Sequence, residues 1–324
     1  MKKCNAIKPC SLGKYNIYDI SKKGDQIIIV SSPYNSLNIR LDELSGKLIH
    51  CPHNLSKIYL FNSKKNKLNL NINGCTHKVL PNQYPITKGK IVFCAFVKNE
   101  DSYIRQWIDY HHNLGVDKFI IYDNAGVNDE TSYCSSENSS DLESVLSEYI
   151  NNELVCLIKW PYPKRVNGCV VGQVTQQNHT LYNFNDSKYI GFFDIDEYLN
   201  PQKHSNISDM IDDLKQKGYN EDLYGGIKIK NKFFYNPDKL NTQGINFLKI
   251  YNCDALTKEG REKNIINPKL CRSIAIHEVT SGKKCFTVNH ADCIFNHYYY
   301  LNKDYRGNDE TNLIDKSISK HIIK

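Results

Sequence analysis

The chain has 324 residues, of which 40% are hydrophobic, and its 42 basic and 35 acidic residues give a formal net charge of +7. This length allows two domains, and the apolar content supports a folded core, which excludes a wholly disordered protein. No run approaches the roughly 20 consecutive apolar residues of a membrane helix, so we expect no membrane span, and the mild charge favours a phosphate-bearing ligand over a nucleic-acid partner.

The N-terminus starts with basic Lys2 and Lys3 but has no apolar segment after them, so we expect no secretory signal. The 12 cysteines include no CxxC pair, which disfavours a zinc ribbon or a thioredoxin motif. We therefore expect reduced thiols in a cytoplasmic protein, or one of the host cytoplasm or virion if the source is viral.

Residues 1–88 contain short apolar runs separated by turn-prone clusters, without helical periodicity. We predict a small β-rich accessory domain of unknown role over residues 1–88, and a linker near residues 81–90. The second domain then covers residues 89–324. Strands are expected at residues 26–30, 36–40 and 67–72.

From residue 91 onward, the pattern alternates between strands and helices. Residues 91–97 are apolar throughout, as in a parallel strand buried on both faces. A helix follows over residues 104–114, with Asn99 or Asp101 as its cap and Gly115 as its stop; its histidines, His111 and His112, are expected to be structural. The alternation predicts a Rossmann-like, mostly parallel α/β sheet with flanking helices. Further strands are expected at residues 119–122, 154–159, 189–195 and 226–230, and further helices near 173–184 and 207–214.

Polar residues follow three of these strands, at the sheet edge where ligands of parallel sheets bind. They are residues 98–101, 123–124 and 194–197. Because side chains alternate along a strand, we expect Asp194 and Asp196 on one side and Ile195 on the other. Two carboxylates at a strand end suit Mg²⁺ or Mn²⁺, with substrate phosphates completing the shell. The competing interpretation is a solvated loop, and the apolar strand before it favours the metal site.

Several segments, in order along residues 91 to 308, together resemble a known family. The opening segments are Phe96–Glu100, Tyr103-Ile104, Trp107-Ile108, Tyr110-His111, Leu114–Val116, Phe119 and Tyr122–Asn124. The later ones are Phe193–Tyr198 with Pro201, Lys263–Ile266 with Pro268, Ile276-His277, Asn296–Tyr298 and Arg306-Gly307. This series resembles glycosyltransferase family 92 and its family 2-like relatives, and it departs from the commoner pattern at His179 and Tyr198. The first 90 residues resemble no family that we can name.

The resemblance implies a GT-A fold enzyme that moves a sugar from a nucleotide donor, commonly a UDP-sugar, to an acceptor hydroxyl. It implies that Asn99 and Glu100 lie at the nucleotide and that Asp123 binds the base. The acceptor is left open among a glycan, a protein and a lipid-linked molecule.

The resemblance also implies that Asp194 and Asp196 hold a divalent cation, Mn²⁺ or Mg²⁺, which bridges the donor diphosphate. A histidine from the C-terminal region often joins such a metal. His277 and His297 are the two candidates, and the sequence does not choose between them.

Cleavage of the sugar–phosphate bond places negative charge on the departing diphosphate, which cations stabilise. Lys98, Lys263 or Arg261 are candidates for that role. Inversion at the sugar, which the resemblance favours, needs a general base. Glu278 and Asp254 lead the candidates, followed by Glu221 and Asp222.

Two other classes of protein stay open as alternatives, of which the first would use the same carboxylates. One is a metal-dependent phosphotransferase or nuclease, which would need further acidic ligands for a second metal. The other is an inactive carbohydrate-binding protein with the same fold. The intact Asp194 and Asp196 pair favours an active enzyme.

Overall fold

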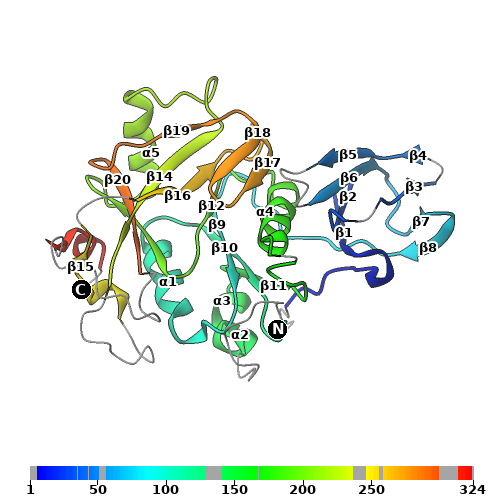
Figure 1. The fold of residues 1–324 in the computed structure, drawn as a ribbon, viewed down its shortest axis with the longest axis horizontal. Coiled ribbons are helices and arrows are strands. Elements are labelled where there is room, and N and C mark those ends of the chain that lie inside the picture. The colour runs from blue at the N-terminus through cyan, green and yellow to red at the C-terminus, as the bar shows by residue number, and fades with distance from the viewer. Residues whose placement is uncertain are drawn as a thin grey trace.

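The computed structural model describes residues 6–34, 36–42, 44–50, 56–127, 141–166, 168–235, 246–254, 258–298 and 313–322. A β-rich N-terminal part lies beside a larger α/β part (Figure 1). Among the helices of these ranges, none combines the length and the apolar character needed to cross a membrane.

The N-terminal part consists of two four-stranded antiparallel sheets. The first has the order β1 (Ile17–Lys23), β2 (Gln26–Ser31), β6 (Lys57–Asn62), β5 (Lys47–His50), and the second β4 (Leu44–Ser45), β3 (Ile39–Leu41), β7 (Leu68–Ile72), β8 (Cys75–Val79). In β7 the buried Leu68, Leu70 and Ile72 alternate with polar residues and join a cluster shared by both sheets. The predicted β-rich character of this region is confirmed.

The α/β part is built on a nine-stranded sheet. Its order is β11 (Val155–Lys159), β10 (Lys118–Asp123), β9 (Ile91–Val97), β12 (Tyr189–Phe192), β16 (Lys258–Ile266), β14 (Gly226–Phe233), β20 (Cys293–His297), β13 (Glu197–Pro201), with β19 (Cys285–Thr287) also on β14. The first four strands are parallel, and antiparallel pairs occur only toward the β13 end. The predicted mostly parallel α/β sheet is confirmed.

Helices cover both faces of this sheet. On one face lie α1 (Asp101–Asn113) and α5 (Ile207–Gln216), together with the short α2 (Leu142–Val145) and α3 (Ser147–Asn151). On the other face lies α4 (Val171–Asn183). Beyond the sheet, β17 (Cys271–Ala275) pairs with β18 (Glu278–Gly282), and β15 (Asn252–Cys253) pairs with β21 (Leu313–Ile314). Short 3₁₀ turns occupy Gly13–Tyr15, Phe247–Lys249 and Ser317–His321.

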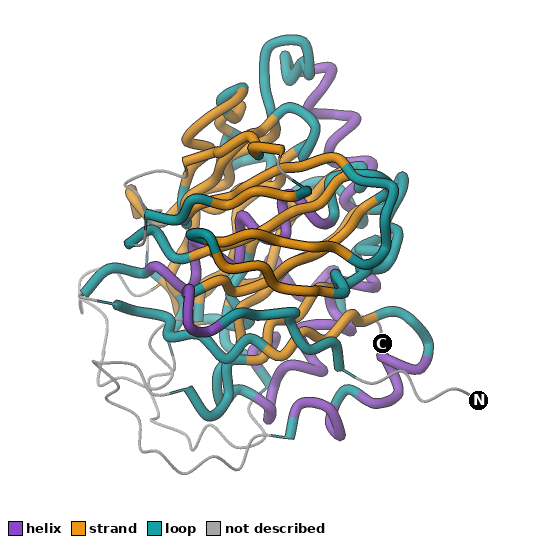
Figure 2. The backbone as a smooth tube through the Cα atoms, turned by 90° about the vertical axis from the view of Figure 1, so that its right-hand side faces the viewer, coloured by secondary structure: helices purple, strands orange, loops and turns teal. Residues whose placement is uncertain are grey.

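The two faces of β9 belong to two different hydrophobic clusters. Ile91, Phe93, Ala95 and Val97 pack with α1 and α5, whereas the intervening residues pack with α4. The α4 cluster also contains Tyr18, Ile28, Val30 and Ile58 of the N-terminal part. Helix α4 therefore lies between the central sheet and the N-terminal part (Figure 1). Figure 2 views the molecule from the side of the N-terminal part, whose strands lie in front.

Helix α1 lacks a side-chain cap at its start and is held near its end by His111. It begins with Glu100 at the N-cap position and no side-chain cap, so the predicted cap by Asn99 or Asp101 is wrong. Gly115, with a φ of 102°, follows the helix as predicted. The buried His111 donates from Nδ1 to the carbonyl of Trp107 (2.9 Å) and accepts at Nε2 from the amide of Leu199 (3.1 Å), which confirms its structural role.

Candidate active site

The acidic segment after β12 forms a turn. β12 ends at Phe192, and the Glu197 amide donates to the Asp194 carbonyl (3.1 Å), which reverses the chain before β13. The Glu197 carboxylate also accepts a hydrogen bond from the Asp194 amide (2.9 Å). The predicted strand over residues 189–195 is therefore confirmed for Tyr189–Phe192, but its extension through Asp194, with Asp194 and Asp196 alternating along it, is wrong. The turn still brings both carboxylates to one cavity.

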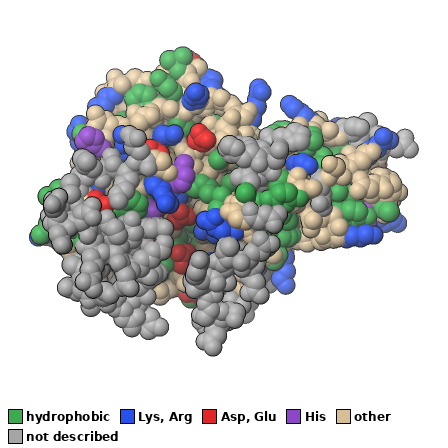
Figure 3. Space-filling view, in the orientation of Figure 1, with side chains coloured by type: hydrophobic (Ala, Val, Ile, Leu, Met, Phe, Trp, Pro, Cys, Tyr) green, Lys and Arg blue, Asp and Glu red, His purple; other side chains and the backbone are tan. Residues whose placement is uncertain are grey.

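This cavity has a volume of about 440 Å³ and lies at the carboxyl ends of β9 and β12. Its acidic lining residues are Glu100, Asp194, Asp196 and Glu197. Its basic lining residues are Lys164, Arg165, Arg261 and Lys263, with His277 and His297. Charged and histidine side chains accordingly gather near the middle of the α/β part in Figure 3. This cavity is the candidate active site.

Three side chains in the cavity form a possible metal site. One ligand atom each from Asp196, Glu197 and His297 lies within 4.8 Å of the other two. His297 Nε2 is 3.6 Å from Asp196 Oδ2, and Nδ1 is 3.6 Å from Glu197 Oε1. Pairing of β13 with β20 sets Glu197 directly opposite His297. Burial disfavours the imidazolium, but the two carboxylates outweigh it and raise the pKa of His297.

Lys263 of β16 bridges the carboxylates of Asp194 and Glu197, the two residues that are hydrogen-bonded across this turn. Its Nζ lies 2.7 Å from Asp194 Oδ2 and 3.0 Å from Glu197 Oε2. Burial alone would raise the pKa of Asp194, but Lys263 and Lys164 outweigh it and hold this pKa well below its ordinary value. Burial raises the pKa of Glu197 to about 7, against the opposing effect of Lys263. Asp194 therefore serves an internal ion pair, outside the cluster of Asp196, Glu197 and His297.

The other predicted residues on the cavity wall are Glu100, Arg261 and His277. Glu100 accepts a hydrogen bond from the Tyr103 hydroxyl (3.1 Å), and burial followed by the charge of Asp196 raises its pKa to about 8. His277 Nδ1 lies 2.8 Å from the carbonyl oxygen of Glu262, and burial lowers the pKa of the imidazole. His297, rather than His277, joins the carboxylate cluster.

The remaining residues predicted at the nucleotide lie off the cavity wall. Asp123 is buried, where it accepts hydrogen bonds from Lys159 Nζ (2.7 Å) and the Ala125 amide (3.0 Å). Lys98 Nζ donates to the carbonyl of Val127 (2.7 Å), and Asn99 is exposed with a left-handed φ of 56°. Their predicted contacts with a nucleotide stay predictions.

The predicted general bases also lie off the wall of this cavity. Glu278 is exposed on β18, and Asp254 is buried after β15 with its amide bonded to the carbonyl of Phe233 (3.0 Å). The Glu221 carboxylate accepts hydrogen bonds from Tyr189 and Asn267. The last candidate, Asp222, is exposed.

The sequence-based site omitted Glu197, Lys164 and Arg165. Glu197 directly follows the predicted metal residues, so the continuous acidic run was an available signal. The Lys164-Arg165 pair precedes α4 in a loop, and nothing in its local pattern distinguishes it from a solvated turn. Tyr298 is buried, with its amide bonded to the Asp196 carbonyl (2.9 Å). Its neighbours Tyr299 and Tyr300, and the Arg306-Gly307 block, lie outside the described residues.

Comparison with known proteins identifies the family. The family model described as Glycosyltransferase family 92 matches residues 90–324. The chain is 27% identical over 232 residues to a glycosyltransferase family 92 protein of Arabidopsis thaliana, and 26% identical over 224 residues to one of Oryza sativa subsp. japonica. These matches cover 66% and 64% of this chain but 36% and 32% of those proteins, so the chain spans about a third of their length.

Among solved structures, the apo structure of the WbbM bifunctional glycosyltransferase matches 53% of this chain and 26% of its own, with 11% identity and a TM-score of 0.28. That score is too low to support an argument about the fold. The family model, by contrast, covers well over half of the chain. The chain therefore belongs to glycosyltransferase family 92.

Proposed function

We propose that the chain transfers a sugar from a nucleotide-sugar, a UDP-sugar first of all, to an acceptor hydroxyl in a reaction that depends on Mn²⁺ or Mg²⁺. The observation that carries this proposal is the cluster of Asp196, Glu197 and His297 in a cavity that four basic residues also line. A glycan, a protein and a lipid-linked molecule are the acceptor classes to be tested.

The three ligands fit a hard divalent cation. Two carboxylates and one imidazole suit Mn²⁺, and the carboxylates also suit Mg²⁺. The 3.6 Å distances to Asp196 and Glu197 are measured from different ring nitrogens of His297, and one ion can take only one of them. One ligand atom from each of the three residues lies within 4.8 Å of the other two, so the three side chains would hold the ion by one atom each. When bound, the ion would supply positive charge to the departing diphosphate.

The basic side chains supply the rest of that charge. Lys164, Arg165 and Arg261 line the cavity together with the buried Lys263. Lys164 Nζ lies 5.9 Å from the ring centre of Phe96, which leaves it beside an apolar wall. Cations held in such partly desolvated surroundings stabilise a developing anion more strongly than they would in water.

Inversion at the sugar remains part of the proposal. It requires a group that accepts the proton of the acceptor hydroxyl. Glu278 and Asp254 keep that role as candidates. Their Gln and Asn variants should lose transfer while retaining donor binding.

Thermal unfolding with ligands tests the donor and the metal together. We expect UDP with MnCl₂ to raise the melting temperature and EDTA to abolish the rise, because Asp196, Glu197 and His297 would hold the ion and the ion would supply positive charge to the diphosphate. Asp196→Asn should remove the shift, whereas Asp212→Asn, an exposed residue of α5 and a matched control, should retain it. If no nucleoside diphosphate stabilises the wild type, the nucleotide-donor proposal fails. If UDP does stabilise it, a screen of UDP-sugars for hydrolysis would identify the donor sugar.

A further inference from the structure

Helix α4 is almost entirely buried, although many of its side chains are polar. The buried polar residues are Gln173, Thr175, Gln176, Gln177, Asn178, His179, Thr180 and Asn183. Burial of polar groups is costly unless they are hydrogen-bonded. Their partners therefore show which elements the helix holds together.

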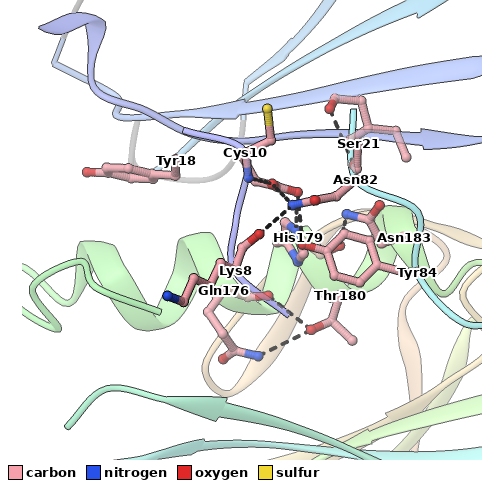
Figure 4. A network of polar contacts seen from close by, with 12 residues as sticks. Lys8, Cys10, Tyr18, Ser21, Asn82, Tyr84, Gln176, His179, Thr180 and Asn183 are labelled. Carbon is pink, nitrogen blue, oxygen red and sulfur yellow. Dashed lines mark hydrogen bonds and ion pairs between the residues drawn. The ribbon is translucent and has the colours of Figure 1, made fainter. Parts of the chain in front are cut away.

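One partner is Asp19 of β1, whose carboxylate is fully buried and accepts four hydrogen bonds. Oδ1 accepts from the Cys10 amide (2.7 Å) and from Asn82 Nδ2 (3.0 Å). Oδ2 accepts from the Tyr84 hydroxyl (3.1 Å) and from His179 Nε2 (2.9 Å). Figure 4 shows Asn82, Tyr84 and His179 converging between the N-terminal part and α4. His179 is also fully buried, so this hydrogen bond joins the two parts without solvent.

From Asp19 and His179, further hydrogen bonds lead into the central sheet. Tyr122 OH donates to His179 Nδ1 (2.6 Å) and accepts from Thr180 Oγ1 (2.9 Å). Gln176 Nε2 donates to Thr180 Oγ1 (3.2 Å) and to Cys94 Sγ (2.7 Å). This series of hydrogen bonds ties α4 to β9 and β10, and the carboxyl end of β9 lies at the cavity.

The first turns of α4 contact the cavity itself. Gln173, three residues before Gln176, donates from Nε2 to Asp194 Oδ1 (3.3 Å). The Gly172 amide donates to the carbonyl of Lys164 (3.0 Å), another cavity residue. A helix is rigid over such a distance, so a shift at His179 also moves these contacts.

We propose that the Asp19–His179 hydrogen bond is a positioning element of the active site. It fixes the placement of α4 and, through the helix, of Gln173 against Asp194. The β-rich N-terminal part thereby acquires a role, because it supplies Asp19 and three of the four groups that bond to it. The ligand-binding arm of the test below rests on the proposed donor site, and the exchange arm does not.

Hydrogen exchange read by mass spectrometry tests the placement of α4. Asp19→Asn should speed amide exchange over residues 171–183 by about tenfold, because the helix loses its charged partner. Asp42→Asn, which removes an exposed ion pair with Lys65 in the same part of the molecule, is the matched control. If Asp19→Asn does not fold, Tyr84→Phe removes one donor to Asp19 and should give a smaller increase. Unchanged α4 exchange in a folded variant overturns the proposal.

Calorimetric titration with UDP and MnCl₂ separates positioning from general support of the fold. Asp19→Asn should weaken UDP binding by about tenfold. In a protein that already carries Gln173→Ala, the same change should weaken binding by less than about a further twofold, because both substitutions act through the contact of Gln173 with Asp194. Additive effects would overturn a role exerted through Gln173. If the wild type does not bind UDP, the donor proposal fails, and the exchange result still decides the role of Asp19.

Discussion

Replacement of Lys263 by methionine probes the charge balance of the active site. Lys263 exposes 3% of its side chain and lies between Asp194 and Glu197. Methionine keeps much of the apolar stem and removes the charge. Glu197, whose side chain is 1% exposed, then loses its neighbouring cation and gains no water, whereas Asp194, at 34%, stays partly solvated.

Removal of one partner from a buried ion pair costs about 3–5 kcal/mol. Because water screens Asp194, we expect the lower end, a loss of about 3 kcal/mol of unfolding free energy at pH 8. The pKa of Glu197 is raised to about 7 in the folded protein, so folding favours its protonated form and stability falls between pH 4.5 and pH 7. Without Lys263, this decrease of stability with rising pH continues past pH 7. The unfolding free energy that Lys263→Met removes should therefore be about 1.4 kcal/mol smaller at pH 6 than at pH 8.

Urea unfolding in the presence of EDTA, followed by tryptophan fluorescence, measures both quantities. The two tryptophans, Trp107 and Trp160, are buried on opposite faces of the sheet and report on the α/β part. Lys269→Met, at an exposed position, is the matched control and should stay within about 0.5 kcal/mol of the wild type. A Lys263→Met protein as stable as the wild type at pH 8, or a loss independent of pH, would refute the reasoning.

Two further substitutions test how α4 and α1 are held. A Cβ at Gly172 would lie 2.0 Å from the carbonyl oxygen of Pro163, so Gly172→Ala should lower the free energy of unfolding in urea by about 1–3 kcal/mol. Gly13→Ala is the control and should not lower it, because a Cβ there meets nothing within 4 Å. Equal stability of the two variants would contradict this prediction. Burial lowers the pKa of His111 to about 3. The neutral ring therefore contributes fully to the free energy of unfolding above pH 6.5, and about 2 kcal/mol of this free energy is lost when the pH falls to 5. His111→Gln should reduce the change of unfolding free energy between pH 6.5 and pH 5. The control His112→Gln, at an exposed position, should not reduce it. An unchanged pH dependence in His111→Gln would exclude His111 as the cause.

Elements with local patterns were predictable from the sequence. The predicted strand over residues 91–97 matches β9, since burial on both faces leaves a continuous apolar run. The ordered motifs also predicted the family and four residues of the cavity wall, Glu100, Asp194, Asp196 and Lys263. These predictions needed only residue type, spacing and order.

The acidic segment shows where such reasoning fails. A period of two placed Asp194 and Asp196 together on an extended strand, but hydrogen bonds between Asp194 and Glu197 close a turn there. The role of Glu197 follows from its position opposite His297, 100 residues later in the chain. A local pattern carries no information about that pairing.

The sequence by itself determined the α/β class, the β-rich start, the family motifs and most of the chemical groups at the cavity. Only the tertiary structure decided which histidine joins the carboxylates, which carboxylate pairs with Lys263, and that Asp123 bonds to Lys159. It also decided that Asp19 of the N-terminal part reaches His179 of α4. The physical reason is that helices and strands follow from neighbours in sequence, whereas buried charges select partners by distance and desolvation, which exist only after the chain has folded.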